Sequence, residues 1–184
     1  MPARQARMYQ IHRSIDISFA HHVRGHKGAC INVHGHTWKF ELGLEAEVLD
    51  NEGFVLDFSK LKATVLNRCH ALLDHSLAVG EATYSDIASS LEPLGMQLVA
   101  SRKEVHDEPI PTDCTVVKLG TAENRYPGGM KVTVFPFSPT SERLAEWLFN
   151  TTVAELEDER VKVTFARIYE TLHPVESVAE YRRS

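Results

Sequence analysis

The chain has 184 residues, with 20 Lys and Arg against 25 Asp and Glu, so its formal net charge at pH 7 is -5. This length favours a single domain, residues 1–184, with a core of its own. The negative charge excludes a general attraction for nucleic acid or for an anionic membrane surface.

Cysteine content and hydropathy indicate a cytoplasmic protein. Three cysteines are too few, and odd in number, for a disulfide framework, which favours a reducing compartment. No apolar run reaches the roughly 20 residues needed to span a bilayer. The polar start of the chain also lacks the apolar centre of a signal peptide.

Two strands and a helix are predicted in the first half of the chain. Alternating apolar positions predict strands from Tyr9 to His21 and from His34 to Val48. The turn "NEGF" follows, and "SKLKATVLNRCHALLD" has helical spacing, with Ser59 as the candidate N-cap.

The second half begins with a long stretch of weak periodicity. Residues 80–138 contain scattered Gly and Pro, so we expect irregular structure there, with a hairpin ending at "MKVTVFPF". "PTSERLAEWLFNTTVAELED" predicts a second helix capped by Thr140 or Ser141, and "VKVTFARIYETL" and "VESVAEYR" predict closing strands. This order predicts an α+β fold, an antiparallel sheet with its helices on one face.

Five histidines and a cysteine crowd into "HHVRGHKGACINVHGH". His21 falls on the apolar row of the first strand, and His34 and His36 fall on the apolar row of the second, whereas His22 falls on the opposite face. Burying three imidazoles is unfavourable unless their nitrogens are satisfied, and a shared Zn²⁺ satisfies all three. Three separately hydrogen-bonded core histidines are the alternative.

The residues between the two strands suggest what surrounds such a metal. Three histidine ligands are typical of a catalytic zinc site that keeps one position open. Cys30 is a candidate fourth ligand, or else a thiolate near the metal that acts as base or nucleophile. Arg24, His26 and Lys27 form a positive patch suited to phosphate groups, with a solvated basic loop as the equal alternative.

Five short motifs, in this order, resemble the 6-pyruvoyltetrahydropterin synthase and 6-carboxytetrahydropterin synthase family. They are "AH" at 20–21, "CINVHGH" at 30–36, "LDH" at 73–75, "PTSERLAEW" at 139–147 and "YET" at 169–171. The resemblance covers most of the chain apart from about residues 80–135. It implies the tunnelling fold (T-fold), a four-stranded antiparallel sheet with two helices on one face, here with a long insertion before the second helix.

The resemblance also implies an assembly and roles for individual residues. Subunits are expected to form trimers that pair into hexamers, with active sites at the subunit interfaces. The expected zinc ligands are His21, His34 and His36; the expected catalytic residues are Cys30, Asp74 and His75; the expected substrate-binding residues are Glu170, Thr171 and Lys27.

Elementary chemistry supports these roles unevenly. An Asp beside a His can orient and charge it, which makes Asp74 and His75 a possible proton shuttle, although a terminal His also suits a helix dipole. A carboxylate can accept two N–H bonds from a pterin. Glu170, however, alternates with Phe165 and shares its parity with Ile168, so its face is ambiguous, and a solvated carboxylate is the alternative.

The length of the spacer between Cys30 and "HGH" indicates to which subgroup of the family the sequence is most similar. Three residues, "INV", intervene, which resembles the 6-carboxytetrahydropterin synthases of the queuosine and 7-deazapurine pathway. The implied reaction converts 7,8-dihydroneopterin triphosphate to 6-carboxy-5,6,7,8-tetrahydropterin, with loss of triphosphate and acetaldehyde. The alternatives are a 6-pyruvoyltetrahydropterin synthase or related pterin lyase, and a non-catalytic zinc or pterin-binding protein.

Overall fold

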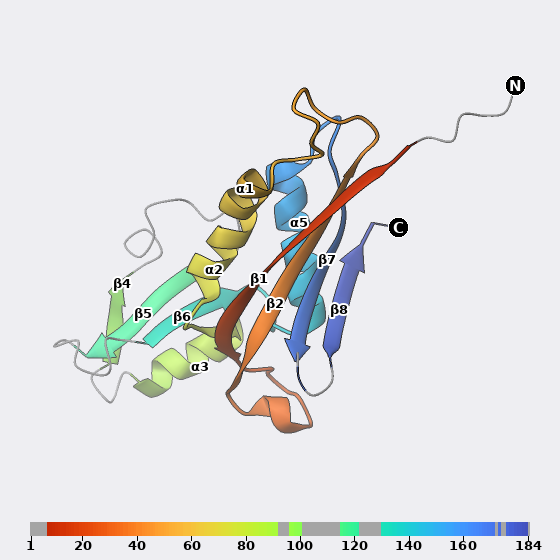
Figure 1. Cartoon of the computed structure of the whole chain (residues 1–184). Coiled ribbons are helices and arrows are strands. Elements are labelled where there is room, and N and C mark those ends of the chain that lie inside the picture. Colours follow the sequence, from red (N-terminus) through yellow and green to blue (C-terminus); the bar gives the residue numbers. More distant parts are fainter. Residues whose placement is uncertain are drawn as a thin grey trace, which may run out of the picture.

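The computed structural model describes residues 7–91, 96–100, 115–121, 130–171, 173 and 176–183 (Figure 1). The strands are β1 (Tyr9–His21), β2 (His34–Ala46), β3 (Leu77–Gly80), β4 (Met96–Ala100), β5 (Thr115–Thr121), β6 (Met130–Phe135), β7 (Lys162–Thr171) and β8 (Ser177–Arg182). The helices are a 3₁₀ turn η1 (Ala29–Ile31), α1 (Phe58–Leu61), a π-helical segment η2 (Lys62–Leu66), α2 (Asn67–Leu73), α3 (Glu81–Leu91) and α5 (Ser141–Leu156).

The strands form one mixed sheet in the order β4-β5-β6-β3-β1-β2-β7-β8. The neighbours β1, β2, β7 and β8 pair antiparallel, as expected, whereas β3 lies parallel to both β1 and β6. The α+β class is confirmed, but the prediction of a four-stranded sheet is wrong, because the described sheet has eight strands. The short strand β3 joins the two parts, and its four residues, "LAVG", are too few to show an alternation.

The described parts of the stretch from 80 to 138 contain a helix and strands, whereas the sequence suggested irregular structure there. These elements are α3 and the strands β4, β5 and β6, and the hairpin prediction is confirmed by the antiparallel pairing of β5 with β6. The helix α3 was missed because "EATYSDIASSL" carries few large apolar side chains, so its apolar periodicity is weak. Residues 92–95, 101–114 and 122–129 of this stretch lie outside the described residues.

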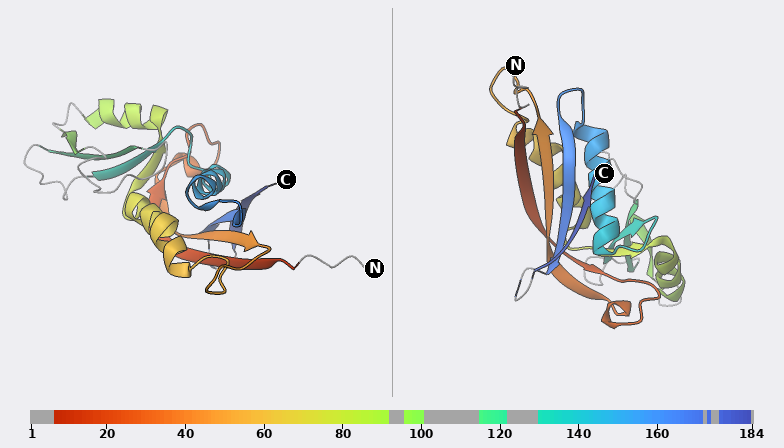
Figure 2. Two further views of the ribbon diagram at one scale, coloured as in Figure 1. Left: turned by 90° about the horizontal axis from the view of Figure 1, so that it is seen from above. Right: turned by 90° about the vertical axis from the view of Figure 1, so that its right-hand side faces the viewer.

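The core lies between the sheet and the helices. Figure 2 shows α2 and α5 on the same side of the strands β1, β2, β7 and β8. The inward row of β2, from Trp38 through Phe40 and Leu42 to Leu44, is fully buried, and Leu148 of α5 is fully buried as well. Burying a side chain of this size stabilises the fold by about 1.5–3 kcal/mol.

Of the two expected N-caps, the one on the second predicted helix is confirmed and the one on the first is not. Thr140 caps α5, as expected, and its hydroxyl accepts a hydrogen bond from the N–H of Arg143. The first helix is capped by Asp57 rather than by Ser59, because the Asp57 carboxylate accepts bonds from the backbone N–H groups of Ser59 and Lys60. Within the described residues, no helix has both the length and the apolar character needed to cross a membrane.

A β-bulge in β7 decides which way its last residues face. Phe165 pairs with Gly43, but the next pair is Val163 with Leu44, so β7 has one residue more than β2 at this point. A side chain at Gly43 would overlap the ring of Phe165, so the close approach requires glycine here. Because a bulge shifts the alternation by one residue, Val163 and Ile168 are both buried although their numbers differ in parity.

The first prediction concerns the helix cap. Replacing Asp57 by Ala removes the acceptor for two N–H groups at the start of α1, so we expect Tm to fall by roughly 2–4 °C. The matched variant Ser59→Ala keeps both backbone bonds to Asp57 and should lower Tm less. Thermal unfolding followed by circular dichroism measures the Tm of both variants. A Ser59→Ala protein whose Tm falls as much as that of Asp57→Ala, or more, would contradict the assignment of the cap.

Candidate functional site

The β1–β2 ladder brings the three predicted histidines together. His21 pairs with His34, and Phe19 pairs with His36, so the three imidazoles lie on one face at the end of the ladder. His21 is buried, and His34 and His36 are half-buried. The ring of Trp38 packs edge-on against His21 and His36, with centroids 4.9 and 5.2 Å away. The histidines therefore border the apolar core.

A carboxylate completes the cluster. The Nε2 atoms of His21 and His34 are 3.1 Å apart, and Glu170 Oε1 lies 3.5 Å from the Nε2 atoms of both His21 and His36. One ligand atom from each of the four residues can be chosen so that all lie within 4.8 Å of one another. These four residues could hold a metal ion.

Hydrogen bonds fix the tautomers of two of the rings. His21 Nδ1 lies 2.9 Å from the carbonyl oxygen of Pro139, and His34 Nδ1 lies 2.9 Å from that of Asn32. A carbonyl oxygen only accepts, so each Nδ1 must carry the hydrogen, and each neutral ring presents a lone pair at Nε2. Two lone pairs that face each other at 3.1 Å repel unless a cation or a proton lies between them. The donor set fits a divalent metal.

Burial favours the neutral form of the His21 and His36 rings. Desolvation lowers the pKa of His21 below its usual value, and the hydrogen bond to Pro139 opposes this shift only in part. Desolvation also lowers the pKa of His36, against the attraction of Glu170. The Nε2 atom of His36 is buried and has no hydrogen-bond partner among the described residues. Neutral rings with free Nε2 atoms are the form that binds a metal.

Glu170 faces inward because of the bulge in β7. Its Oε2 atom accepts a hydrogen bond of 2.5 Å from the hydroxyl of Ser141, the first residue of α5. The sequence left the face of Glu170 open and treated Ser141 only as a possible helix cap. The one signal in the sequence was the occurrence of both residues in the motifs "PTSERLAEW" and "YET".

The other expected site residues lie outside this group of four. Cys30 is half-buried in the turn η1, and its carbonyl oxygen accepts a bond from the N–H of Val23. Lys27 is exposed in the same loop, and Thr171 is half-buried at the end of β7. Cys30 is thus no member of the described metal-binding group, although it lies in the chain segment that joins its two strands.

Asp74 and His75 form a dyad on the turn after α2. His75 Nδ1 lies 2.7 Å from Asp74 Oδ2, and the His75 side chain is 85% exposed. Burial opposes ionisation of Asp74, but the hydrogen bond from His75 and the nearby His70 outweigh it and lower the pKa of this carboxyl. His75 has a φ of 55°, in the left-handed region, which non-glycine residues adopt mostly under local constraint.

Strand β6 supplies part of that constraint. The Nζ atom of Lys131 donates to the carbonyl oxygens of Ala71 and Asp74, at 2.8 and 2.9 Å. The buried hydroxyl of Thr133 donates to the carbonyl oxygen of Leu72 at 2.9 Å. These bonds satisfy carbonyl groups at the C-terminal end of α2, which a helix cannot satisfy internally. The region from 80 to 138 therefore contributes directly to the turn that carries the dyad.

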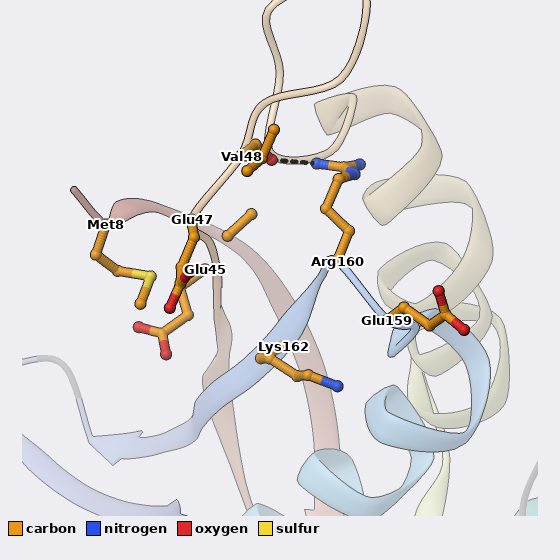
Figure 3. Close-up of a pocket in the computed structure, with 8 residues that line it drawn as sticks. Met8, Glu45, Glu47, Val48, Glu159, Arg160 and Lys162 are labelled. Carbon is orange, nitrogen blue, oxygen red and sulfur yellow. Dashed lines mark hydrogen bonds between the residues drawn. The ribbon is translucent and has the colours of Figure 1, made fainter. Parts of the chain in front are cut away.

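Two of the cavities lined by described residues lie outside the histidine cluster. One, of about 690 Å³, separates the loop after β1 from α3; there Arg24 forms an ion pair with Asp86, and His22 Nδ1 lies 3.3 Å from Thr83 Oγ1. Arg24, part of the expected phosphate patch, thus has an acidic partner. The other, of about 470 Å³, lies at the opposite end of the β1–β2 ladder (Figure 3), where Arg160 donates to the carbonyl oxygen of Val48.

Residues 10–184 match the family model described as 6-pyruvoyl tetrahydropterin synthase. The chain belongs to this family. Among curated relatives, a 6-carboxy-5,6,7,8-tetrahydropterin synthase of Haemophilus influenzae is 24% identical over 169 residues, which cover 89% of this chain and 94% of the relative. The protein of the same name from Bacillus subtilis is 37% identical over 70 residues, 38% of this chain and 45% of the relative.

Solved structures share the fold. A crystal structure of an uncharacterized protein from Wolinella succinogenes superposes with a TM-score of 0.67 at 21% identity, covering 96% of this chain and 99% of the other. The 6-pyruvoyl tetrahydropterin synthase of Plasmodium vivax superposes with a TM-score of 0.55 at 18% identity, with the same coverage. At these identities the likeness establishes the T-fold architecture.

The second prediction concerns pH and the metal-free protein. The pKa of His21 is lowered in the folded state, so between that pKa and the ordinary value of about 6.5 the unfolded chain binds more protons. The free energy of unfolding should therefore fall as the pH is lowered through about 6.5 and recover above it. Chemical unfolding after chelation, at several pH values, measures this slope.

His21→Gln removes the buried titrating ring and should flatten the slope. His12→Gln is the matched control, since the His12 side chain on the same strand is 59% exposed, and it should change the slope less than His21→Gln does. Identical slopes for all three proteins would contradict the prediction.

Proposed function

We propose that the chain is a zinc-dependent 6-carboxy-5,6,7,8-tetrahydropterin synthase of the queuosine and 7-deazapurine pathway. It acts in the cytoplasm on 7,8-dihydroneopterin triphosphate and releases acetaldehyde and triphosphate. The observation that carries the proposal is the convergence of the His21 and His34 Nε2 lone pairs, 3.1 Å apart, in a family of pterin synthases. The spacer "INV" and the names of the curated relatives support the 6-carboxy product.

In the proposed site, His21, His34 and His36 would hold the zinc ion through their Nε2 atoms. Zinc bound there supplies a Lewis acid that polarises the hydroxyl groups of the substrate side chain and makes the neighbouring C–H protons easier to remove. The carbonyl groups of Pro139 and Asn32 keep the His21 and His34 rings in the tautomer that this role requires.

The remaining residues bind the substrate and move protons. Glu170 accepts N–H bonds from the pterin ring, with Thr171 next to it, and this fixes the side chain of the substrate over the histidines. Lys27 holds phosphate oxygens. Asp74 accepts the Nδ1 proton of His75, which leaves Nε2 free to take up and return a proton, and Cys30 serves as the second proton carrier.

We also propose a trimer-based homo-oligomer, with trimers that pair into hexamers and active sites between subunits. Two features support it. The His75 side chain is 85% exposed, so the dyad of one chain is accessible to another. In the described residues, β1 pairs with β3 only at Ala20 and His21, and β8 is the last strand of the sheet, so both offer free edges for pairing across subunits.

A second candidate is a 6-pyruvoyltetrahydropterin synthase. The family model and the Plasmodium vivax structure carry that name. A zinc or pterin-binding protein without turnover is the third. The products formed from dihydroneopterin triphosphate separate these functions.

The third prediction is the product. Incubation of the zinc-loaded protein with 7,8-dihydroneopterin triphosphate should release one acetaldehyde for each substrate consumed, and mass spectrometry should detect 6-carboxytetrahydropterin. A 6-pyruvoyl product would instead establish the second candidate. Absence of turnover with zinc bound would favour the binding protein.

The fourth prediction tests the role of Cys30. Cys30→Ala removes a proton carrier and should reduce kcat by about 10²–10⁴-fold. Cys69→Ala is the matched control, because Cys69 is buried in the core on α2, and it should keep kcat within a few-fold of the wild type. Steady-state release of acetaldehyde measures both variants, and a Cys30→Ala enzyme of undiminished kcat would remove Cys30 from the mechanism.

The fifth prediction is metal content. The purified protein should bind about one Zn²⁺ per chain by elemental analysis, and His36→Ala should lower this content strongly, because it removes one of three nitrogen ligands. His12→Ala should leave the zinc content unchanged. A wild-type chain that takes up no zinc would contradict the proposed site.

A further inference from the structure

The position of the Glu170 carboxylate does not match a metal site with a free coordination position. Tetrahedral zinc with bonds of about 2.0–2.1 Å separates its ligand atoms by about 3.3 Å from one another. The Nε2 atoms of His21 and His34 are 3.1 Å apart. Oε1 of Glu170 lies 3.5 Å from Nε2 of His21 and 3.5 Å from Nε2 of His36. Glu170 Oε1 therefore lies near the distance of a fourth ligand from two of the histidines, and the ligand atoms of all four residues lie within 4.8 Å of one another.

An ordinary ion pair does not account for this position. The His21 Nδ1–H is used by Pro139, so the neutral ring presents a lone pair, not a proton, to the carboxylate. The His36 Nε2 atom makes no hydrogen bond with Glu170 or with another described residue. Lone pairs and a carboxylate oxygen thus point toward one another. A cation between them stabilises this arrangement, and without a cation these groups repel one another.

The second carboxylate oxygen is held separately. Ser141 Oγ donates to Oε2 at 2.5 Å, and Ser141 is only 9% exposed. This bond sets the rotation of the carboxylate and leaves Oε1 directed at the histidines. It is the kind of outer contact that orients a metal ligand.

We infer that Glu170 is the fourth protein ligand of the metal when no substrate is bound, so that the resting site is closed by His21, His34, His36 and Glu170. This inference rests on the zinc site proposed above and deepens it. The same carboxylate is the proposed acceptor for the N–H groups of the pterin. Binding of the pterin ring therefore draws Glu170 away from the histidines and opens the position that the hydroxyl groups of the substrate need. Pterin recognition and opening of the site become one event.

The experiment uses the full-length protein with Co²⁺ in place of Zn²⁺, because the visible spectrum of Co²⁺ reports its ligands and geometry. Glu170→Gln should change the Co²⁺ spectrum of the resting protein and weaken Zn²⁺ binding by at least about tenfold. Glu176→Gln is the matched control: Glu176 is an exposed glutamate whose carboxylate lies 3.6 Å from Lys39 Nζ, and its spectrum and zinc affinity should equal those of the wild type. A Glu170→Gln protein with unchanged spectrum and affinity overturns the inference.

A second measurement needs no variant, so it remains decisive if Glu170→Gln fails to fold. Unsubstituted pterin, which has no side-chain hydroxyl groups, is added to the wild-type Co²⁺ protein. A spectral change that saturates with pterin binding supports the exchange of Glu170 from metal to ring. Pterin binding, measured by fluorescence, without any spectral change overturns it. A wild-type chain that binds neither Co²⁺ nor Zn²⁺ would instead overturn the zinc site itself, so the two failures are distinguishable.

Discussion

The antiparallel pairing of β1 with β2 is the constraint on which the site depends. Each strand has 13 residues, and their register places His21 directly opposite His34 at the end of the ladder. A shift of one residue would turn every side chain of one strand to the other face. The register is held by the inward row that runs through Trp38 and Phe40, because that row must remain in the core. The hydrophobic core thus sets the geometry of a polar site at its edge.

Strand β6, in the described part of the region from 80 to 138, belongs to the scaffold of the site. It extends the sheet through β3, and Lys131 and Thr133 of β6 bind the carbonyl groups that end α2. The Asp74–His75 turn is therefore held from two sides, since His75 N–H also donates to Ser18 of β1. A residue with φ of 55° persists only where its surroundings determine it, and here two separate strands do so.

The sequence predicted that the three histidines share one face but left the face of Glu170 open, for a physical reason. Alternation along β1 and β2 is uninterrupted, so the face of His21, His34 and His36 can be read from the core residues beside them. Glu170 lies beyond a bulge, which shifts the alternation by one residue and makes parity misleading. Asp57 and Ser59 illustrate a similar limit, because both residue types cap helices and only the backbone direction decides between them. Strand β3 is too short for any periodicity.

The four residues of the cluster are not equally fixed, and this difference has a functional consequence. His21 and His34 are each held by a carbonyl group and by the paired strands, so their Nε2 atoms have little freedom to separate. Glu170 is 24% exposed and near the end of β7, and among the described residues its carboxylate accepts a hydrogen bond only from the Ser141 hydroxyl, which can rotate to another acceptor. When lone pairs and a carboxylate converge, the least constrained group moves first on a change of charge or ligand. The fold therefore holds the His21 and His34 nitrogens in place and leaves the Glu170 carboxylate freer to move, which is the combination that the proposed site requires if it must both retain a metal and admit a substrate.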